Sequence, residues 1–383
     1  MHAGTAIWLG LGWWLVSVVV HWLSAALARR PRANSDAVAV LRAPADFSIV
    51  APFAGGADAS FAYVQALKAL AEAGAEVLIC VADANDGAVA PLRALWPEAP
   101  VLVGADRTFN PKVNNVRKGL ERASRPIVVL CDAGTTLDID TLRRAAAPLS
   151  SRTGLVLALK AAEAPENFAA EIERAYIDGH QARFLFAADR LGLTVASGGV
   201  TLLSNDTLQR IDNWRGFNRW IADDYSVTRS VRELGLETRL GSVMPPLPLG
   251  RRDWGVVWRR QVRWARTRLR LPVWPLVLWE PMIGWLISGL SGLLALAAMG
   301  AGVGVLLAGL AFHTVFWLAG EKWFMAGRGL VFGSRAAAAA LLREALAPVL
   351  MVSALSGRSI DWRGTDLGGQ WRTRGDDPPE RVV

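Results

Sequence analysis

A short apolar stretch that ends abruptly at a carboxylate constrains the fold of this chain more than any other feature. Residues 127–131 (Ile-Val-Val-Leu-Cys) are followed directly by Asp132, Ala133 and Gly134. Five apolar residues, mostly β-branched, are typical of a strand that is buried on both faces of a sheet. Ligands of open α/β sheets bind beyond the carboxyl ends of the strands, so Asp132 is expected at the rim where chemistry takes place. A carboxylate there suits a divalent cation that grips a diphosphate, and a helix cap or a turn is the structural alternative.

The sequence around this strand predicts an α/β domain. From residue 41 to residue 250 short apolar runs alternate with helical patterns, which is the signature of α/β proteins. Because the carboxyl ends of such strands gather at one edge, polar residues that follow them are candidates for a site. Further strands are expected at 47–53, 76–82, 99–103, 154–159 and 194–203, and helices near 61–73, 137–149, 169–189 and 227–234.

An acidic cluster follows the strand expected at 76–82. Asp83 and Asp86 lie in the run Asp-Ala-Asn-Asp-Gly at 83–87, again at the carboxyl end of a strand. A solvated turn explains this run by itself, because turns favour Asp, Asn and Gly. Contact with a ligand is the functional alternative.

The segment 109–115 (Phe-Asn-Pro-Lys-Val-Asn-Asn) opens the helix that leads to the central strand. Asn110 precedes Pro111 and is biased away from the helical conformation, so the helix should start at or just after the proline. Lys112 in the first turn is unfavourable for the helix dipole. A cation placed there against this preference is expected to face an anion such as a phosphate, and an exposed lysine is the alternative.

Two motifs in the second half of the domain add candidate ligand contacts. Gly198 and Gly199 interrupt the strand expected at 194–203, and glycine inside a strand often marks the close approach of a ligand or of another backbone. Asp223 and Asp224 precede a predicted helix. The roles of helix cap and first-turn acid explain one of these acids more readily than both.

An apolar segment near the N-terminus predicts a membrane anchor. Residues 6–28 contain no Asp, Glu, Lys or Arg and are long enough to span a bilayer. Arg29 and Arg30 follow, so the positive-inside rule places the N-terminus outside and the next residues in the cytoplasm. A cleaved signal peptide would have the reverse order of charge. The tryptophans of the segment include candidates for interfacial anchors: Trp8, Trp13, Trp14 and Trp22.

The C-terminal third combines a basic block with further apolar segments. Eight arginines lie between 251 and 270, where Asp253 is the only acid, and tryptophans are interleaved. RNA or single-stranded DNA could bind such a composition. Because the block directly precedes the apolar segments 279–299 and 301–319, a basic helix on an anionic bilayer surface is favoured instead. The segment 336–355 is apolar but contains charged residues and a proline, so that both a spanning and a surface-bound placement are open.

Charge and cysteine content agree with this interpretation. The formal net charge of +8 fits a nucleic acid or an anionic membrane surface, and the position of the basic block selects the membrane, with no nucleic acid as partner. Cys80 and Cys131 both end apolar runs, which favours buried reduced thiols and a reducing compartment. The predicted domains are an anchor with its basic flank (1–32), an α/β domain (41–250), a basic interfacial segment (251–275), C-terminal membrane helices (276–356) and a charged tail (357–383).

Taken in order, the motifs resemble those of processive-type family 2 glycosyltransferases, which have three separated aspartates and an [RQ]-x-x-R-W motif, here Arg-Gln-Val-Arg-Trp at 260–264. More narrowly, the chain resembles the ceramide glucosyltransferases and their bacterial relatives, including the hopanoid-associated glycosyltransferases. The similarity covers roughly residues 45–365. It is carried by residues 110–115, 131–134 and 222–225, with weaker support from Gly-His-Gln-Ala-Arg at 179–183 and Asp-Trp-Arg at 361–363.

The resemblance implies a GT-A-type, Rossmann-like domain and a role for each matching residue. Asp86, or Asp83 beside it, would contact the nucleotide, and Asp132 would help to hold a divalent cation, Mg²⁺ or Mn²⁺, on the diphosphate. Asp224 would be the general base. The remaining expected site residues are Arg260, Arg263 and Trp264, which would close over the diphosphate and the acceptor entrance, and Lys112, Asp223, His180 and Gly198 as substrate contacts.

Two positions depart from the family pattern. The family usually has Lys-Pro-Leu at the end of the first strand, where this chain has Ala51, Pro52 and Phe53, so a lysine on the nucleotide side is missing. The second motif is Asp-Ala-Gly in place of Asp-x-Asp, which leaves Asp132 as the only acid for a metal within that motif. A single acid weakens the expected hold on the metal.

These features predict an inverting glycosyltransferase that moves a hexose from a UDP-sugar to a hydroxyl of a membrane lipid. Displacing a nucleoside diphosphate requires cationic groups for the leaving group and a base for the acceptor hydroxyl. Ceramide is the expected acceptor, and a hopanoid polyol is the alternative. A polysaccharide synthase and a non-catalytic scaffold of the same fold are less favoured. The expected location is a bacterial-type inner membrane, with several spans and the catalytic domain in the cytoplasm.

Overall fold

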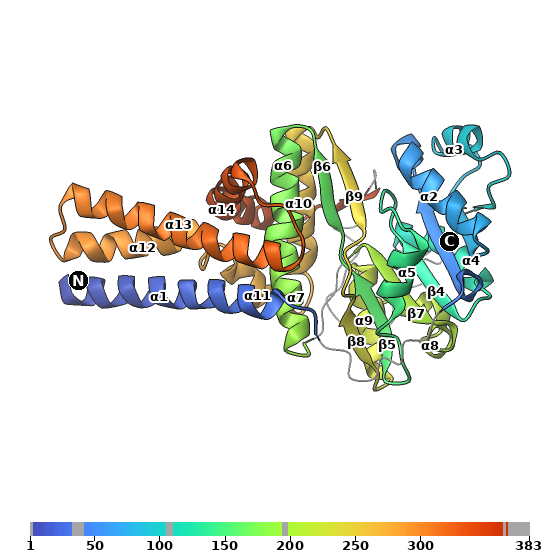
Figure 1. Cartoon of the computed structure of the whole chain (residues 1–383), viewed down its shortest axis with the longest axis horizontal. Coiled ribbons are helices and arrows are strands. Elements are labelled where there is room, and N and C mark those ends of the chain that lie inside the picture. Colours follow the sequence, from blue (N-terminus) through green and yellow to red (C-terminus); the bar gives the residue numbers. More distant parts are fainter. Residues whose placement is uncertain (1–2, 33–41, 105–109, 194–197, 363–364, 367–383) are drawn as a thin grey trace. The chain divides into compact units, whose positions relative to one another are not determined.

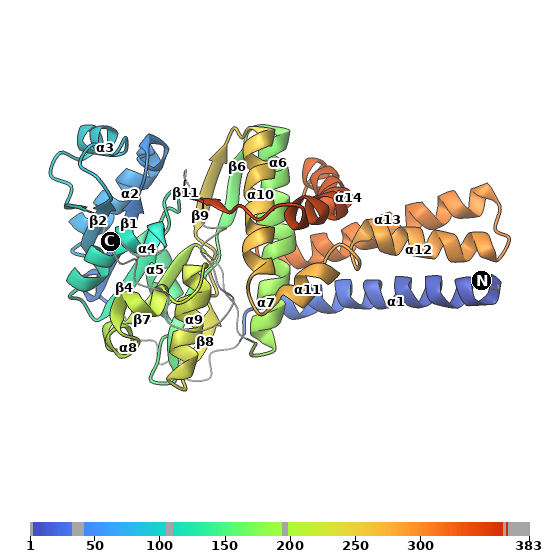
Figure 2. The same cartoon turned by 180° about the vertical axis from the view of Figure 1, so that it is seen from behind.

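The computed structural model describes residues 3–32, 42–104, 110–193, 198–362 and 365–366 of the chain. The chain folds into two compact units, whose elements are labelled in Figure 1 and, from behind, in Figure 2. The helical unit comprises Met1–Arg30, Ala164–Arg190 and Leu249–Arg358, and the sheet unit comprises Pro31–Glu163, Leu191–Pro248 and Ser359–Val383.

The sheet unit is built on a mixed sheet that has seven strands among the described residues, in the order β3-β2-β1-β4-β7-β5-β8. Only β7 runs antiparallel to its neighbours, β4 and β5, whereas the other described pairs are parallel. The strands are β1 (Phe47–Phe53), β2 (Glu76–Val81), β3 (Val101–Val103), β4 (Ile127–Cys131), β5 (Thr153–Ala158), β7 (Val200–Ser204) and β8 (Glu237–Leu240). The α/β fold class predicted from the sequence is therefore confirmed.

Helices cover both faces of this sheet. Along β1, Ile49 belongs to a core cluster that includes residues of α2, α3 and α5, whereas Val50 points to the opposite face, where it meets α4 at Gly119. A Cβ atom at Gly119 would lie 2.7 Å from both Val50 Cγ1 and Cys80 Sγ, so glycine is what lets α4 lie this close to β1 and β2. The helices are α2 (Phe61–Glu72), α3 (Val89–Leu95), α4 (Pro111–Arg122), α5 (Ile139–Ala146), α8 (Asn205–Arg210) and α9 (Asp223–Glu233).

The strand that ends at Asp132 is where the sequence placed it. All five residues of β4 are buried, and β4 lies between β1 and β7. The expected strand at 194–203 is shorter, because β7 starts at Val200, while residues 194–197 lie outside the described part of the chain. The sequence did not predict the short two-stranded sheets of β6 (Ala161–Pro165) with β9 (Pro246–Gly250) and of β10 (Asp361–Trp362) with β11 (Thr365–Asp366).

The described part of the helical unit contains a group of apolar helices, α1, α12 and α13, and a second group around α10. In Figure 1, α12 lies beside both α1 and α13, and residue contacts join α1, α12 and α13 pairwise. A second set of contacts joins α6, α10 and α14. The elements are α1 (Ala3–Ala28), α6 (Phe168–Arg174), the π-helical turn η3 (Ala175–Gln181), α7 (Ala182–Arg190), α10 (Trp254–Leu269), α11 (Trp274–Trp279), α12 (Trp285–Ala298), α13 (Val303–Gly327) and α14 (Ser334–Leu355).

Three helices within the described residues are long and apolar enough to cross a membrane: Gly4–Ala28, Val303–Gly327 and Ser334–Leu355. Many large apolar side chains on these helices are exposed, among them Leu9, Leu15, Leu307 and Val315. Such an exposed apolar surface is typical of helices that face lipid. The predicted apolar helices near both ends of the chain are therefore confirmed.

One predicted boundary differs from the way the chain packs. Residues 164–190 lie in the middle of the α/β domain expected at 41–250, but they group with the apolar helices in the helical unit. The helical pattern at 169–189 was predicted correctly, and the long-range packing of α6 and α7 was not. The five functional domains expected from the sequence stay a prediction.

Candidate active site

The sheet unit positions a lysine between acids that come from different elements. Asn110 is the N-cap of α4, because its Oδ1 accepts hydrogen bonds from the backbone N–H groups of Lys112 at 3.0 Å and of Val113 at 3.4 Å. Its Nδ2 donates to the carbonyl oxygen of Ile221 at 3.3 Å. Pro111 occupies the first helical position, as predicted. These contacts fix the start of α4, whereas Phe109 lies outside the described residues.

Lys112 bridges two carboxylates. Its Nζ lies 2.7 Å from Asp132 Oδ1, just after β4, and 2.7 Å from Asp223 Oδ2, the first residue of α9. The three side chains are 15%, 21% and 18% exposed, respectively. Burial would lower the pKa of Lys112, but the two carboxylates raise it well above its usual value. The sequence predicted an anion opposite Lys112, and in the structure the anions are these carboxylates.

A second lysine approaches the same acid. Lys160 Nζ lies 3.7 Å from Asp132 Oδ2. Burial would raise the pKa of Asp132, but Lys112 and Lys160 hold it below its usual value, so Asp132 is ionised at neutral pH. Lys160 was not predicted as a site residue, although it lies two residues after β5, and a position after a strand end is the same signal that pointed to Asp132.

Gly198 lies at the Asp132 carboxylate. A Cβ atom at Gly198 would be 3.1 Å from Asp132 Oδ2, and the backbone N–H of Asp132 donates to the carbonyl oxygen of Gly199 at 2.9 Å. The glycine pair therefore precedes β7 and brings the backbone close to the acid. The alternative of a helix cap for Asp132 is wrong, because Asp138 caps α5. The alternative of a turn is confirmed, because the carbonyl oxygen of Asp132 accepts a hydrogen bond from the backbone N–H of Thr135 at 3.2 Å.

Asp224 is the acid with the most altered proton affinity in this cluster. Burial, followed by the negative charge of Asp223, raises the pKa of Asp224 to about 7, against the opposing effect of Lys112. Its Oδ1 accepts a hydrogen bond from the backbone N–H of Tyr225 at 2.8 Å. The predicted cap role was wrong for both acids, because Ala222 is the N-cap of α9 and both acids lie in the first turn.

Asp83 and Asp86 bind backbone groups at the ends of β1 and β2. Asp86 Oδ1 accepts hydrogen bonds from the N–H groups of Gly55 at 2.7 Å and Ala88 at 2.8 Å. Asp83 Oδ1 accepts one from Asn85 at 2.7 Å. Asp86 thus ties the loop after β1 to the loop after β2, and Asp83 closes a turn. The nucleotide contact expected from the resemblance stays a prediction for both.

The site meets the chemical requirement for a divalent cation only in part. Hard cations such as Mg²⁺ bind carboxylate oxygens, commonly one or two together with substrate phosphates and water. Asp132 supplies an ionised carboxylate on a rigid strand end. Within the described ranges no three His, Cys, Asp or Glu side chains form a possible metal group. The residues therefore fit an ion that takes most of its ligands from a bound diphosphate.

In the helical unit, the arginine motif lies on α10 and is held by a buried acid. Glu173 of α6 is fully buried and forms ion pairs with Arg260 and with Arg252, whose Nε lies 3.2 Å from Glu173 Oε2. Glu173 was not predicted as a site residue, because a single glutamate in a helical pattern looks like part of a solvated face. Arg263 is half-buried on the same helix.

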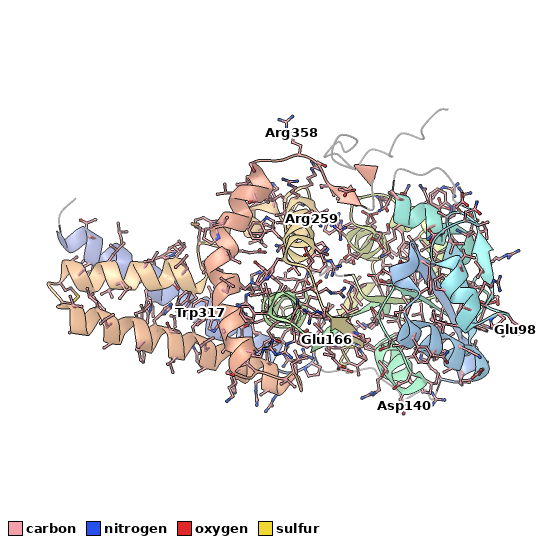
Figure 3. The ribbon with its side chains drawn as sticks, turned by 90° about the horizontal axis from the view of Figure 1, so that it is seen from above. Glu98, Asp140, Glu166, Arg259, Trp317 and Arg358 are labelled. Carbon is pink, nitrogen blue, oxygen red and sulfur yellow. The ribbon has the colours of Figure 1, made fainter. Side chains whose placement is uncertain are left out.

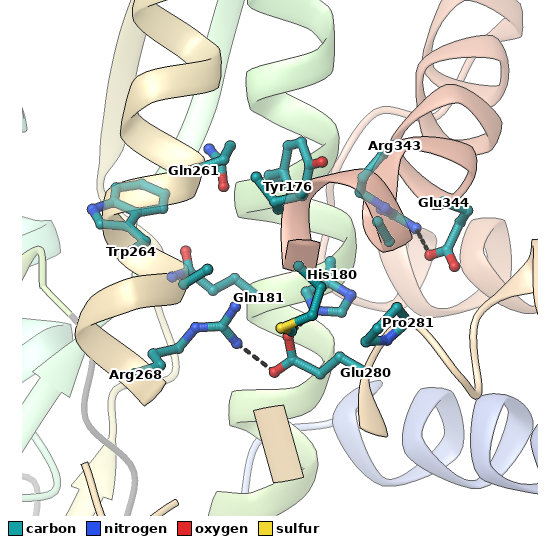
Figure 4. A pocket seen from close by; sticks show the side chains of 14 residues that line it. Tyr176, His180, Gln181, Gln261, Trp264, Arg268, Glu280, Pro281, Arg343 and Glu344 are labelled. Carbon is teal, nitrogen blue, oxygen red and sulfur yellow. Dashed lines mark hydrogen bonds and ion pairs between the residues drawn. The ribbon is translucent and has the colours of Figure 1, made fainter. Parts of the chain in front are cut away.

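Trp264 and His180 both line one cavity of the helical unit, shown in Figure 4. The cavity has a volume of about 50 Å³. Glu280 at its edge forms an ion pair with Arg268 and lies 3.6 Å from His180 Nε2. Burial would raise the pKa of Glu280, but Arg268 and His180 lower it to about 2. The structure thus brings together two residues that the sequence singled out separately.

More arginines of the basic block have partners within the protein than the sequence indicated. Besides Arg252 and Arg260, Arg268 pairs with Glu280, and Arg266 donates to the carbonyl oxygens of Ser353 and Ala354. Asp253 is therefore not the only partner of this block, and α10 packs against α6 and α14. The side-chain view in Figure 3 includes Arg259, which is exposed.

The chain belongs to glycosyl transferase family 21, whose family model matches residues 11–374. By class it is therefore a member of a glycosyltransferase family, and the resemblance found in the sequence is confirmed. The chain is 23% identical over 309 residues to ceramide glucosyltransferase 3 of Caenorhabditis elegans. It is 22% identical over 313 residues to ceramide glucosyltransferase 1 of the same organism. These matches cover 77% and 78% of this chain and 66% of the length of each relative.

A solved structure is also similar. It is the mannosyltransferase PcManGT from Pyrobaculum calidifontis in complex with GDP-Man and Mn²⁺, with 18% identity and a TM-score of 0.49. The similarity covers 85% of this chain and 96% of that one.

Proposed function

We propose that the protein transfers a hexose from a UDP-sugar to a hydroxyl of a membrane lipid, with ceramide as the acceptor. The observation that carries the proposal is the acid cluster at the carboxyl end of β4, in which Lys112 joins Asp132 to Asp223 beside Asp224. Membership of family 21 and the similarity to two ceramide glucosyltransferases support the reaction and the acceptor class. A hopanoid polyol is the alternative acceptor.

The acids and lysines have different roles at the sugar donor. Asp132 would hold Mg²⁺ or Mn²⁺, and the chemistry that such an ion supplies when bound is neutralisation of the departing diphosphate. Lys112 and Lys160 bring two positive charges to the same place, where they stabilise negative charge that develops on the leaving group. Asp223 orients Lys112 through its ion pair.

Asp224 acts as the general base. A base works best when its pKa lies near the working pH, and the pKa of Asp224 is raised to about 7. It takes the proton of the acceptor hydroxyl as the oxygen attacks the anomeric carbon. One base and a single in-line displacement invert the configuration at that carbon.

The ends of the membrane helices indicate how the chain is oriented in the membrane. Arg328 Nε at the end of α13 donates to the carbonyl oxygen of Ala28 at 2.7 Å, and Arg29 lies over the ring of Trp323 at 5.0 Å. The C-terminal ends of α1 and α13 therefore lie together and both are basic. By the positive-inside rule this end faces the cytoplasm of a bacterial-type inner membrane.

The test is a transfer assay on membranes that contain the protein. Labelled UDP-glucose, UDP-galactose, UDP-glucuronate and UDP-N-acetylglucosamine are offered with ceramide or a hopanoid polyol, with Mg²⁺ or Mn²⁺ and with chelator. We expect label in ceramide that chelator abolishes. Label in the hopanoid alone would move the proposal to the alternative acceptor. No label in any lipid, with donor still bound, would favour the non-catalytic scaffold.

The Asp224→Asn variant tests the base. It should lower kcat about 100- to 10,000-fold, the range of general-base catalysis, while donor binding stays largely intact. Asp206→Asn is the matched control, because the Asp206 side chain is 77% exposed and lies on α8. Equal loss of transfer and of donor binding in Asp224→Asn would contradict the assignment.

A further inference from the structure

The segment that carries His180 adopts an unusual conformation. Residues Ala175–Gln181 form a π-helical turn between α6 and α7, and such turns occur frequently at functional sites. Gly179 is required in this turn, because a Cβ atom there would overlap the carboxylate of Glu321. The glycine lets the turn rest directly on the ion pair of α13 and α14.

A buried ion cluster fixes the turn. Arg343 of α14 is 1% exposed, and its two terminal nitrogens lie 2.8 and 2.9 Å from the carboxylate oxygens of Glu321. Arg343 Nη2 also lies 2.6 Å from Glu344 Oε1, and its Nη1 donates to the carbonyl oxygen of Ala175 at 2.7 Å. Each charge in this ion cluster has a close partner. The cluster, which forms the floor of the neighbouring cavity, is therefore rigid and does not need a ligand to neutralise it.

The cavity next to this floor is enclosed by several elements of the helical unit. The side chains of Tyr176, His180 and Gln181 reach it from the π turn, and those of Gln261, Trp264 and Arg268 reach it from α10, as Figure 4 shows. Ala347, Leu350 and Met351 of α14 form its apolar side. A volume of about 50 Å³ takes a few non-hydrogen atoms.

Four residues that line this cavity carry a buried polar side-chain atom without a hydrogen-bond partner. Tyr176 Oη and Gln261 Nε2 are buried and have no hydrogen-bond partner, and the same holds for the Nε atoms of Arg268 and Arg343. Tyr176 is 9% exposed and Gln261 is 5% exposed. Buried polar groups are normally paired, since leaving one unpaired is costly. Burial raises the pKa of Tyr176 to about 12, so its hydroxyl is protonated and can donate.

The charges around the cavity select the chemistry of its occupant. Arg268 is balanced by Glu280, and Arg343 by Glu321 and Glu344. The lining therefore has no excess of positive charge for a phosphate, whereas the unpaired atoms of its residues are mainly hydrogen-bond donors. An uncharged group with oxygen acceptors, such as a hydroxyl or an amide, matches both properties.

The helices around the cavity run along the expected membrane surface. In Figure 1, α6 and α10 run across the direction of α1 and α13, and Figures 1 and 3 show that α14 does the same. If α1 and α13 span the bilayer, these three helices lie in the interfacial layer, where lipid head groups are found. The apolar side formed by α14 is then where the chains of a lipid would leave the cavity.

We propose that this cavity binds the uncharged polar head of a membrane lipid, with Tyr176 Oη and Gln261 Nε2 hydrogen-bonding to its hydroxyl or amide oxygens. That this lipid is the acceptor rests on the proposed function. The cavity gives the acceptor class a physical basis, because it discriminates a neutral sphingoid or polyol head from a phospholipid head by charge.

The test measures lipid binding without transfer. The full chain in nanodiscs of phosphatidylcholine is exposed to a photoactivatable ceramide, or to a photoactivatable phosphatidic acid of the same chain length, and the labelled peptides are identified. We expect ceramide to label peptides from the π turn, α10 or α14 and unlabelled ceramide to compete. Preferential labelling of these peptides by phosphatidic acid, or no labelling by ceramide, would overturn the proposal.

Two variants that remove single polar groups make the test specific. Tyr176→Phe and Gln261→Leu should each weaken competition by ceramide about 3- to 10-fold, the equivalent of one hydrogen bond. Neither should lower the Tm, since the atoms that are lost have no partner in the protein. Ser17→Ala on α1 is the control, because Ser17 Oγ is also buried without a partner but does not line the cavity. Unchanged competition in both variants would mean that the cavity holds water only.

The outcomes separate this proposal from the transferase assignment. Ceramide that binds in the cavity without receiving sugar from any donor would contradict the proposed function and leave the binding site intact. Transfer to ceramide with an unchanged KM for the lipid in both variants would contradict the cavity as the acceptor site and leave the proposed function intact.

Discussion

At the scale of single residues, the candidate site depends on one lysine. Lys112 lies 2.7 Å from carboxylates of both Asp132 and Asp223, so it neutralises charges that would otherwise repel each other. In the proposed function, a cation of the donor complex would bind next to it, at Asp132. We therefore propose two roles for Lys112: it holds the two acids together, and it stabilises negative charge on the donor.

Replacing this lysine tests both roles. Lys112→Met keeps the volume and removes the charge, so it should lower kcat/KM at least 100-fold and destabilise the protein by about 2 kcal/mol, less than for a fully buried pair. Transfer activity and thermal unfolding measure the two effects. Lys68→Met is the control, because Lys68 forms only a long, exposed pair with Glu72 at 3.9 Å. Recovery of Tm, but not of activity, on adding Asp223→Asn would support the two roles, and wild-type activity in Lys112→Met would refute them.

The raised pKa of Asp224 predicts the pH dependence of the reaction. A base must be deprotonated to accept a proton, and the pKa of Asp224 is about 7. Activity should therefore be lost as the pH falls through about 7 and should level off above about 8, in contrast to an ordinary aspartate, which is ionised at every pH above about 5. The measurement is kcat/KM between pH 5.5 and 9. A flat profile across this range would contradict the role of Asp224.

At the scale of elements, the strand ends were predictable and their contacts were not. An apolar run that stops at a carboxylate is a local pattern, so β4 and Asp132 could be located from the sequence. The bridge from Lys112 to Asp223 joins residues far apart in the chain, and one sequence does not reveal which acid a lysine meets. Glu173 was missed for the same reason, and β9 was missed because Pro246 and Pro248 hide a strand pattern.

The close packing of α4 on the sheet is a feature that one substitution can test. Gly119→Ala gains helix propensity of about 1 kcal/mol, but the new Cβ would lie 2.7 Å from Val50 Cγ1 and from Cys80 Sγ. Overpacking of this kind costs about 1–3 kcal/mol, so the Tm should fall, and the shift of α4 should also reduce activity through Lys112. Gly12→Ala on α1 is the control, with no atom within 4 Å of the new Cβ. A higher Tm in Gly119→Ala would contradict the packing.

At the scale of the whole molecule, the membrane helices fall into two groups with different expected placements. The helices α1 and α13 end together at basic residues, as parallel spans would. The helix α14 meets the requirements of length and composition for a span, but it runs across the direction of α1 and α13 in Figures 1 and 3. Its buried arginine and glutamate pair within the protein. These observations favour an in-plane helix, and we propose the surface placement of the two that the sequence left open.

Depth measurements on single cysteines test this placement. Ala338 and Val352 are exposed on α14, and 14 residues of helix separate them by about 21 Å along its axis. An in-plane α14 should give spin labels at Ala338→Cys and Val352→Cys the same shallow depth in a bilayer, as judged by accessibility to oxygen and to a water-soluble quencher. On α13, Val303→Cys and Val315→Cys should differ in depth by most of their axial separation of about 18 Å. The native thiols Cys80 and Cys131 are buried, so they should not react in the folded protein. A depth difference of about 20 Å along α14 would mean that this helix spans the membrane, and the cavity beside it would then lie below the head groups.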